Sequence, residues 1–224
     1  MLTLHHLEYS QSFRILWLLE ELGIDYELKS YNRHPEPFQA PAEYKALSSL
    51  GTAPVITDGD LVLAESAAIM DYILDRTESN QYRPAPGDSN RERYLFWFHA
   101  AQGSMMPLML MEAVFQILKQ RVPFLIRGII RSALGQASER MIKPRMEKLL
   151  IQAEQDLANK PWFGGDQLSA ADILIIYPME SARSRGYITD EYPNCLAWFD
   201  RVAQTDSFQS AQRKDGRDSI VLQV

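Results

Sequence analysis

The 224-residue sequence is poor in cysteine and contains no long apolar run. Its single cysteine, Cys195, excludes an internal disulfide and a zinc site built from cysteines. Because Cys195 stands in a helical pattern with many apolar residues, we interpret it as a small buried side chain. No apolar stretch approaches the roughly 20 residues that a membrane-spanning helix needs, so we expect no membrane as a partner.

Basic residues are also fewer than acidic ones, 23 against 29, which gives a net charge of −6 at pH 7. Nucleic-acid binding requires a concentrated basic face, so we expect no nucleic acid as a partner. Basic residues are denser over 121–148, but acidic residues are interspersed there, which indicates a solvated helix face. A secretory signal is missing from residues 1–6, and we therefore expect a cytoplasmic protein.

The first 80 residues alternate strand patterns with helix patterns. Strands are predicted over residues 2–5, 25–31, 54–57 and 61–64, and helices over 12–22, 42–47 and 66–76. Gly23 stands where a helix-ending residue belongs, and a turn over residues 58–60 joins the last two strands. The first two strands should be parallel neighbours and the last two an antiparallel hairpin. We predict an α/β domain over residues 1–80 with the order βαβαββα and a mixed sheet.

The rest of the chain shows no strand pattern. Residues 81–90 have the proline, glycine and polar content of an inter-domain linker. Beyond them we predict an all-α domain over residues 91–224. Its helices are expected over residues 91–120, 123–159, 169–183 and 193–205, with kinks or breaks at Pro107, Gly128 and Pro144. The residues 213–224 carry no pattern that assigns them a structure.

Five short motifs follow one another along the chain. They are SQSFRILWLLEELG at 10–23, GTAPVI at 51–56, LAESAAIMDY at 63–72, GGDQLSAADI at 164–173 and YPNCLAW at 192–198. In this order and spacing they resemble cytosolic glutathione S-transferases. The proline-rich loop (Pro35, Pro37, Pro41) and residues 102–107 resemble the yeast-type bacterial and fungal branch.

The resemblance implies a thioredoxin-like first domain and a transferase that acts in detoxification. Such an enzyme uses glutathione as co-substrate and needs no metal. It activates the glutathione thiolate for conjugation to a small apolar electrophile, or for peroxide reduction. The alternative is a non-catalytic binding or regulatory protein with the same fold. The resemblance also implies a homodimer with contacts between the first domain of one subunit and the second of the other, to which an exposed Phe38 would contribute.

Glu65 and Ser66 end a strand and open a helix. The free N–H groups and the positive dipole end of a helix favour an anion at this point. Ser66 can therefore take the α-carboxylate of a γ-glutamyl group, while Glu65 can face its ammonium group. The alternative role is a plain helix cap, which the residue types also suit.

Pro54 stands at the start of a strand, where a missing N–H is tolerated. A cis Ala53–Pro54 bond, which the resemblance implies, would turn the backbone of Val55 outward as in an unpaired strand edge. An extended tripeptide such as glutathione could then pair with Val55. The family often has a lysine or glutamine where Thr52 stands, and the short neutral side chain of Thr52 makes a weaker contact.

Ser10 lies in the turn between the first strand and the first helix. A hydroxyl group there can donate a hydrogen bond to the glutathione sulfur, which stabilises the thiolate and lowers the thiol pKa from about 8.5. Thiolate is the nucleophile, so we assign Ser10 as the catalytic residue. Tyr9 and Ser12 are rivals, because the motif shifts by one residue among branches of the family, and helix capping is the alternative role of either serine.

The first long helix is rich in methionine, which is typical of a core but also suits an adaptable apolar pocket. The resemblance places this helix opposite the glutathione site, so we predict an acceptor pocket at His99, Gly103 and Met106. His5 and His6 cannot share a metal ion, because adjacent strand residues point to opposite faces. Ser169 and Asp172 form a capping box, which we interpret as a folding element.

Overall fold

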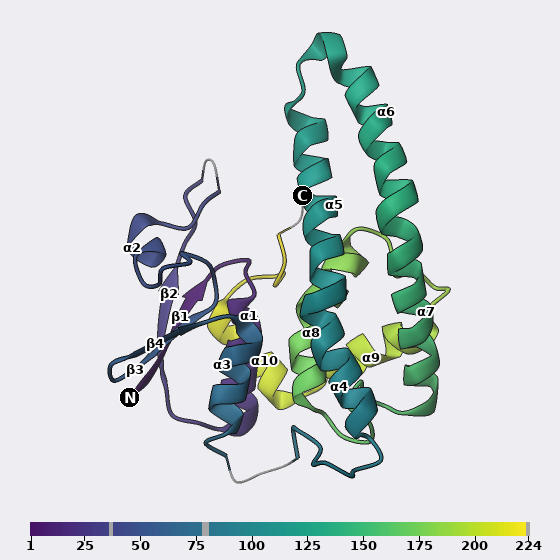
Figure 1. Cartoon of the computed structure of the whole chain (residues 1–224). Helices are drawn as coiled ribbons and strands as arrows, with labels where there is room; N and C mark the ends of the chain where they lie inside the picture. Colours follow the sequence, from purple (N-terminus) through teal and green to yellow (C-terminus); the bar gives the residue numbers. More distant parts are fainter. Residues whose placement is uncertain (36–37, 78–80, 223–224) are drawn as a thin grey trace.

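The computed structural model describes residues 1–35, 38–77 and 81–222. Its N-terminal domain carries a four-stranded sheet with helices, and its C-terminal domain is helical (Figure 1). The N-terminal elements are β1 (Leu2–Leu7), α1 (Ser12–Leu22), β2 (Glu27–Tyr31), α2 (Ala42–Lys45), β3 (Val55–Asp58), β4 (Leu61–Ala64) and α3 (Ser66–Leu74). The predicted order βαβαββα is confirmed. Pro37 of the proline-rich loop lies outside the described residues.

The sheet has the strand order β2-β1-β3-β4 and is mixed, as predicted. Strand β1 is parallel to β2 and antiparallel to β3, which is in turn antiparallel to β4. Val55 at the start of β3 lies opposite His5 on one side and Ala64 on the other. Because antiparallel neighbours run in opposite directions, the carboxyl ends of β1 and β4 meet the amino end of β3 at one end of the sheet.

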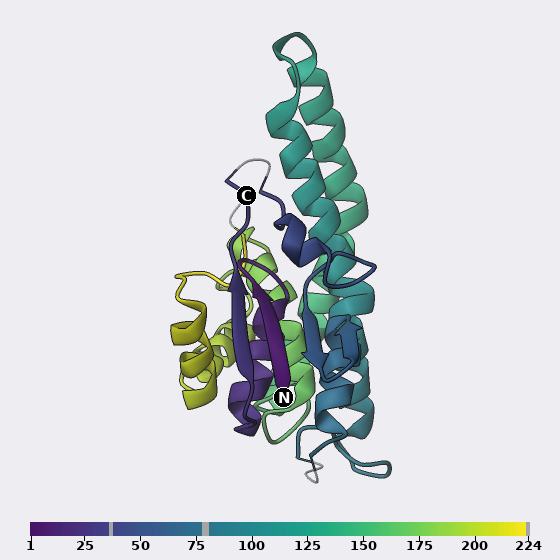
Figure 2. The same ribbon diagram turned by 90° about the vertical axis from the view of Figure 1, so that its left-hand side faces the viewer.

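The C-terminal domain consists of helices within the described residues. They are α4 (Arg91–Ala100), η1 (Ala101–Met105), α5 (Met106–Arg121), η2 (Phe124–Ile126), α6 (Arg127–Ala137), η3 (Ser138–Ile142), α7 (Lys143–Asn159), α8 (Ala170–Ser184), α9 (Pro193–Ala203) and α10 (Asp206–Asp215). Helices α5 and α6 form a long antiparallel hairpin that projects beyond the rest of the molecule (Figures 1 and 2). In the described part of the chain, every helix is too short or too polar to cross a membrane.

Two of the three predicted interruptions of the long helices lie at π-helical turns. Pro107 and Pro144 stand in the first turns of α5 and α7, and each follows a π turn, η1 and η3 respectively. Proline lacks the N–H that the α-helical bond needs, and a wider turn just before it accommodates the loss. Gly128 instead lies in the first turn of α6, after the short 3₁₀ helix η2.

The last helix, α10, is absent from the sequence-based prediction, which ended its final helix at residue 205 and assigned no structure to 213–224. Its N-cap is Thr205, whose hydroxyl accepts a hydrogen bond from the Phe208 N–H. The Phe208 ring packs edge-on against Phe13 and Trp17 of α1, with centroids 5.4 and 5.0 Å apart. A short polar helix such as α10 depends on this packing, because its sequence alone gives little helical stability.

Helix α1 is enclosed on all sides. Its apolar side chains other than the partly buried Leu22 are buried in the main core of the protein: Phe13, Ile15, Leu16, Trp17, Leu18 and Leu19. It packs against β1 and α3 of its own domain and against α8 and α10 of the other. A helix that is apolar around most of its circumference is stable only when it is covered in this way.

The predicted capping box begins α8 and ties three segments together. The Ser169 side chain accepts a hydrogen bond from the Ala171 N–H. The buried Asp172 carboxylate accepts bonds from the Phe163 N–H at 2.7 Å, the Ser169 hydroxyl at 2.8 Å and the Trp198 indole N–H at 3.0 Å. The interpretation of this motif as a folding element agrees with these contacts.

We expect Asp172→Ala to lower the free energy of unfolding by at least about 3 kcal/mol. The change leaves several buried donors without an acceptor, at a cost of about 1–3 kcal/mol for each. Urea unfolding followed by circular dichroism measures the difference. Asp166→Asn is the control, because this nearby carboxylate is exposed and pairs with Lys160 and Asn90. Equal destabilisation by both changes would contradict the role of Asp172.

Candidate active site

A cleft of about 520 Å³ opens at the carboxyl end of β1, beside the segment that precedes β3; Pro54, Val55, Glu65 and Ser66 are not among its lining residues. The turn between β1 and α1 contributes one wall, and the segment before β3 contributes another. Helix α8 of the C-terminal domain closes the cleft with Tyr177. The lining includes Leu7, Tyr9, Ser10, Gln11, Arg33, Phe38, Lys45, Thr52, Ala53 and Tyr177.

Ser10 lines this cleft at the amino end of α1. Its hydroxyl donates to the Leu7 carbonyl at 2.7 Å and lies 2.8 Å from the Ser12 hydroxyl. The Ser10 oxygen also accepts a bond from the Ser12 N–H at 3.2 Å. The side chain is therefore held firmly at the edge of the cleft.

The two rivals of Ser10 have different surroundings. Ser12 is fully buried, where its hydroxyl oxygen accepts a bond from the Leu7 N–H at 3.1 Å, and it does not line the cleft. Tyr9 does line the cleft, and its backbone has a positive φ of 47°. The Tyr9 carbonyl accepts a bond from the Tyr177 hydroxyl at 3.1 Å, so the two domains meet at this residue. The geometry brings Ser10 and Tyr9 to the cleft and leaves Ser12 behind it.

The segment before β3 contains the expected cis Ala53–Pro54 bond. Thr52 is exposed and lines the cleft together with Ala53. Val55 is buried and begins β3, which is an inner strand of the sheet and not an edge strand. Any pairing of a ligand with Val55 therefore has to take place at the amino end of the strand, where the sheet begins.

Glu65 and Ser66 lie beside this point, because Ala64 is the register partner of Val55. Glu65 has a positive φ of 75°, which is costly for a residue with a side chain and is often found where a ligand binds. Ser66 begins α3, and its buried hydroxyl has no hydrogen-bond partner among the described residues. An unpaired buried hydroxyl at a helix amino end is suited to an anionic ligand, which would supply the missing partner.

The cleft is cationic. Arg33 and Lys45 are among its lining residues, and those that belong to the described part of the chain include no aspartate or glutamate. The Arg33 guanidinium donates to the Glu8 carbonyl at 3.0 Å and lies over the Phe38 ring. The sequence predicted an exposed Phe38. In the structure its side chain is half-buried, and its ring contacts Tyr9.

A further cation lies behind Tyr177. Arg14 is fully buried in α1, and none of its three guanidinium nitrogens has a hydrogen-bond partner among the described residues. Its guanidinium lies 5.3 Å from the centre of the Tyr177 ring. Burial lowers the pKa of Arg14 to about 9, so the group is still charged at neutral pH. An unpaired buried charge of this kind favours the binding of an anion nearby.

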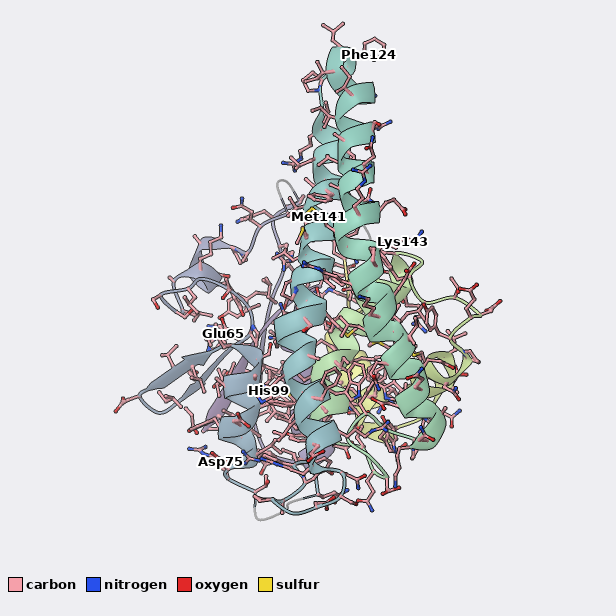
Figure 3. The ribbon with its side chains drawn as sticks, turned by 45° about the vertical axis from the view of Figure 1, so that its right-hand side comes forward. Glu65, Asp75, His99, Phe124, Met141 and Lys143 are labelled. Carbon is pink, nitrogen blue, oxygen red and sulfur yellow. The ribbon has the colours of Figure 1, made fainter. Side chains whose placement is uncertain are left out.

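The predicted acceptor residues do not line this cleft. His99 is exposed on α4, Gly103 lies in η1 and Met106 begins α5. Figure 3 shows His99 on the side of α4 that faces the N-terminal domain. Their role in an acceptor pocket stays a prediction.

Sequence reasoning missed three residues at the site: Arg14, Arg33 and Tyr177. Two of them carried a signal. Arg14 is the only charged residue among the apolar residues at 13–19, and Tyr177 interrupts the apolar run 173–179. A single polar residue within an otherwise buried stretch is unusual and points to a special role.

Two further expectations concern histidine and cysteine. His5 contacts the Tyr31 and Thr57 hydroxyls, whereas His6 contacts Ser12 and Asp215, so the two rings lie on opposite faces of the sheet.

Cys195 is fully buried in α9, where burial raises the pKa of its thiol. The interpretation of Cys195 as a buried apolar side chain agrees with this environment.

Comparisons with known proteins agree with the geometry. Residues 10–76 match the glutathione S-transferase N-terminal domain and residues 106–206 match the glutathione S-transferase C-terminal domain. The chain is 30% identical over 224 residues to Glutathione S-transferase 3 of Schizosaccharomyces pombe, with 99% of this chain and 91% of the relative covered. It is 26% identical to Glutathione S-transferase 1 of Saccharomyces cerevisiae, with 96% and 95% covered.

A solved structure of a glutathione S-transferase from Actinobacillus pleuropneumoniae is 33% identical and has a TM-score of 0.74. The match covers 96% of this chain and 93% of that one. Both family domains match, one after the other along the chain, and the relatives match over nearly its whole length. The chain therefore belongs to the glutathione S-transferase family.

Proposed function

We propose that this glutathione transferase binds glutathione across the end of the sheet and ionises its thiol at Ser10. The thiolate then attacks a small apolar electrophile or reduces a peroxide. The observation that carries the proposal is the position of the Ser10 hydroxyl, which is held at the amino end of α1 in a cationic cleft. A thiolate is favoured by a hydrogen-bond donor and by nearby positive charge, and this cleft offers both.

The binding residues in this proposal are those at the three strand ends. The Ser66 hydroxyl takes the γ-glutamyl carboxylate and Glu65 faces the ammonium group. The backbone of Val55 after Pro54 pairs with the extended tripeptide, and Thr52 adds a weak contact. The unpaired Ser66 hydroxyl and the positive φ of Glu65 support this arrangement, since both features are costly in the absence of a ligand.

A non-catalytic role has less support. A protein that only kept the fold would have no physical need for the combination of Glu65–Ser66, Pro54 and Ser10. We therefore propose an enzyme that acts in detoxification in the cytoplasm and requires no metal. Its second substrate would lie against the first long helix, near His99, Gly103 and Met106. We place the linker between its domains at residues 81–90.

We also propose a homodimer, with the N-terminal domain of one subunit against the C-terminal domain of the other. Support comes from a stripe of exposed apolar side chains on α5, formed by Leu110, Val114 and Leu118. Their spacing of four residues places them on one face of the helix. Figure 3 shows that the hairpin continues to Phe124, far from Glu65. An exposed apolar stripe of this kind is typical of a protein–protein contact.

Ser10→Ala should raise the thiol pKa of bound glutathione by about one to two units. The change removes a hydrogen bond to a developing anion, which contributes roughly 1.5–3 kcal/mol. Conjugation at neutral pH should fall about ten- to a hundredfold. The thiolate absorbance of the complex, titrated against pH, measures the shift, with Tyr9→Phe as the matched comparison. A shift in Tyr9→Phe and none in Ser10→Ala would assign the role to Tyr9 instead.

Ser66→Ala should weaken glutathione binding about tenfold, because a buried hydrogen bond to a carboxylate contributes roughly 1.5–3 kcal/mol and part of this is regained by water. Isothermal titration calorimetry measures the dissociation constant. Ser89→Ala, at an exposed serine outside the site, is the control and should bind like the wild type. An unchanged dissociation constant for Ser66→Ala would refute the assigned carboxylate site.

Light scattering at micromolar concentration should give twice the chain mass of 25.7 kDa. Leu110→Glu should shift the protein toward the monomer, because it places a charge in the apolar stripe. Ile151→Glu, at an exposed apolar residue of α7, should leave the dimer intact. A wild-type mass near that of one chain would contradict the dimer.

A further inference from the structure

Four buried side chains form a continuous chain of hydrogen bonds that ends at the cleft. The Asp215 carboxylate lies 2.6 Å from His6 Nε2, and His6 Nδ1 lies 2.9 Å from the Ser12 hydroxyl. The Ser12 hydroxyl in turn lies 2.8 Å from the Ser10 hydroxyl. All four residues are buried, so their interactions are strong and little affected by solvent. These hydrogen bonds connect the Asp215 carboxylate to Ser10, the proposed catalytic residue.

The C-terminal residues are held so that Asp215 reaches this position. Asp215 is the last residue of α10, and Gly216, with a φ of 72°, turns the chain sharply after it. Arg217 then turns back, where it donates to the Asp215 carboxylate at 3.3 Å and to the Glu8 carboxylate at 3.0 Å. The carboxylate is therefore fixed by contacts on both sides.

The direction of the hydrogen bonds follows from the chemistry of the groups. An ionised carboxylate only accepts hydrogen bonds, so the hydrogen on His6 Nε2 is donated to Asp215. In a neutral imidazole the other nitrogen is then an acceptor, and the Ser12 hydroxyl donates to His6 Nδ1. The Ser10 hydroxyl donates to the Leu7 carbonyl in this structure, and the proposed relay requires it to turn to the Ser12 oxygen, 2.8 Å away. In this state a lone pair of the Ser10 oxygen is available to the cleft.

We propose that this series of hydrogen bonds removes the proton from the glutathione thiol, with His6, Ser12 and Asp215 as positioning residues for Ser10. The S–H bond breaks as its proton passes to the Ser10 oxygen. The Ser10 hydrogen moves to Ser12, and the Ser12 hydrogen moves to His6 Nδ1. Both hydroxyls end neutral, and one proton has moved from sulfur to the imidazole. The inference rests on the proposed function, because it requires glutathione at Ser10.

After the proton transfer the hydrogen bonds run in the opposite direction, and this arrangement stabilises the thiolate. His6 Nδ1 now donates to Ser12, Ser12 donates to Ser10, and Ser10 donates to the thiolate. The Asp215 carboxylate balances the positive charge of the imidazolium. Other charges nearby are Arg217 and Glu8, which are bonded to each other, and the buried Arg14 of α1, the helix that packs on β1. One set of contacts therefore both accepts the proton and holds the anion.

Without His6 the series of hydrogen bonds has no proton acceptor, and Ser10 keeps its bond to the Leu7 carbonyl. Asp215→Asn and His6→Gln should each raise the thiol pKa of bound glutathione by about one unit and lower kcat/KM at neutral pH about tenfold. The KM for glutathione should stay unchanged, because the strand-end contacts remain. Asp215→Glu keeps a carboxylate and should restore much of the wild-type pKa.

Two matched controls separate this effect from a general loss of stability. Asp206→Asn makes the same change at the exposed start of α10, and His5→Gln changes the adjacent histidine on the opposite face of β1. Both should leave the thiol pKa at its wild-type value. Thiolate absorbance against pH, recorded on the full chain with glutathione bound, is the measurement for all variants.

The double variant Ser10→Ala/Asp215→Asn decides whether Asp215 acts through Ser10. The proposal predicts the same thiol pKa as in Ser10→Ala alone, because the path is already broken. An additional shift would mean that Asp215 acts at a distance by its charge, and would overturn the proposal. If Ser10→Ala raises the pKa but His6→Gln and Asp215→Asn do not, the relay is wrong and the proposed function stands. If Ser10→Ala has no effect either, both are wrong.

Discussion

The burial of helix α1 is the constraint on which the site depends. This helix has the sheet and α3 on one side and α8 and α10 on the other, so both domains fix its position. Its amino end fixes Ser12 and the preceding Ser10, of which Ser10 lines the cleft, and even a small shift there would change hydrogen-bond geometry. The order of the strands then brings the segment before β3 and the start of α3 to the same place. The site is thus a consequence of how the sheet and α1 are held.

The site also contains groups that the protein alone leaves poorly satisfied. Arg14 is a buried cation without a hydrogen-bond partner, Ser66 is a buried hydroxyl without one, and Glu65 has a positive φ. Each lowers the stability of the folded protein, and the large shared core offsets these costs. We propose that bound glutathione, with its carboxylate and its thiolate, interacts with this region. Catalysis by preorganised charge requires groups that are fixed before the substrate arrives.

Much of this arrangement was predictable from the sequence. The short strands, the glycine after α1 and the cap at Ser169 follow from local patterns, whereas the roles of Ser10 and Ser66 are predictions that rest on their positions at helix starts and on the family resemblance. Contacts distant in sequence were not predictable: Tyr177 reaches the cleft only through domain packing. Asp215 lies 209 residues from its partner His6, in a helix whose polar sequence gives no local signal. The sequence also does not reveal that β3 is an inner strand, because that depends on which strands pair.

The most direct test of the account is a crystal structure of the protein with glutathione bound. We expect the glutathione sulfur within hydrogen-bonding distance of the Ser10 hydroxyl, with the γ-glutamyl carboxylate at Ser66. The Ser10 hydroxyl should then have exchanged its Leu7 carbonyl partner for the sulfur. A sulfur atom bonded to the Tyr9 hydroxyl, with Ser10 still bonded to Leu7, would contradict the central claim that Ser10 activates the thiol.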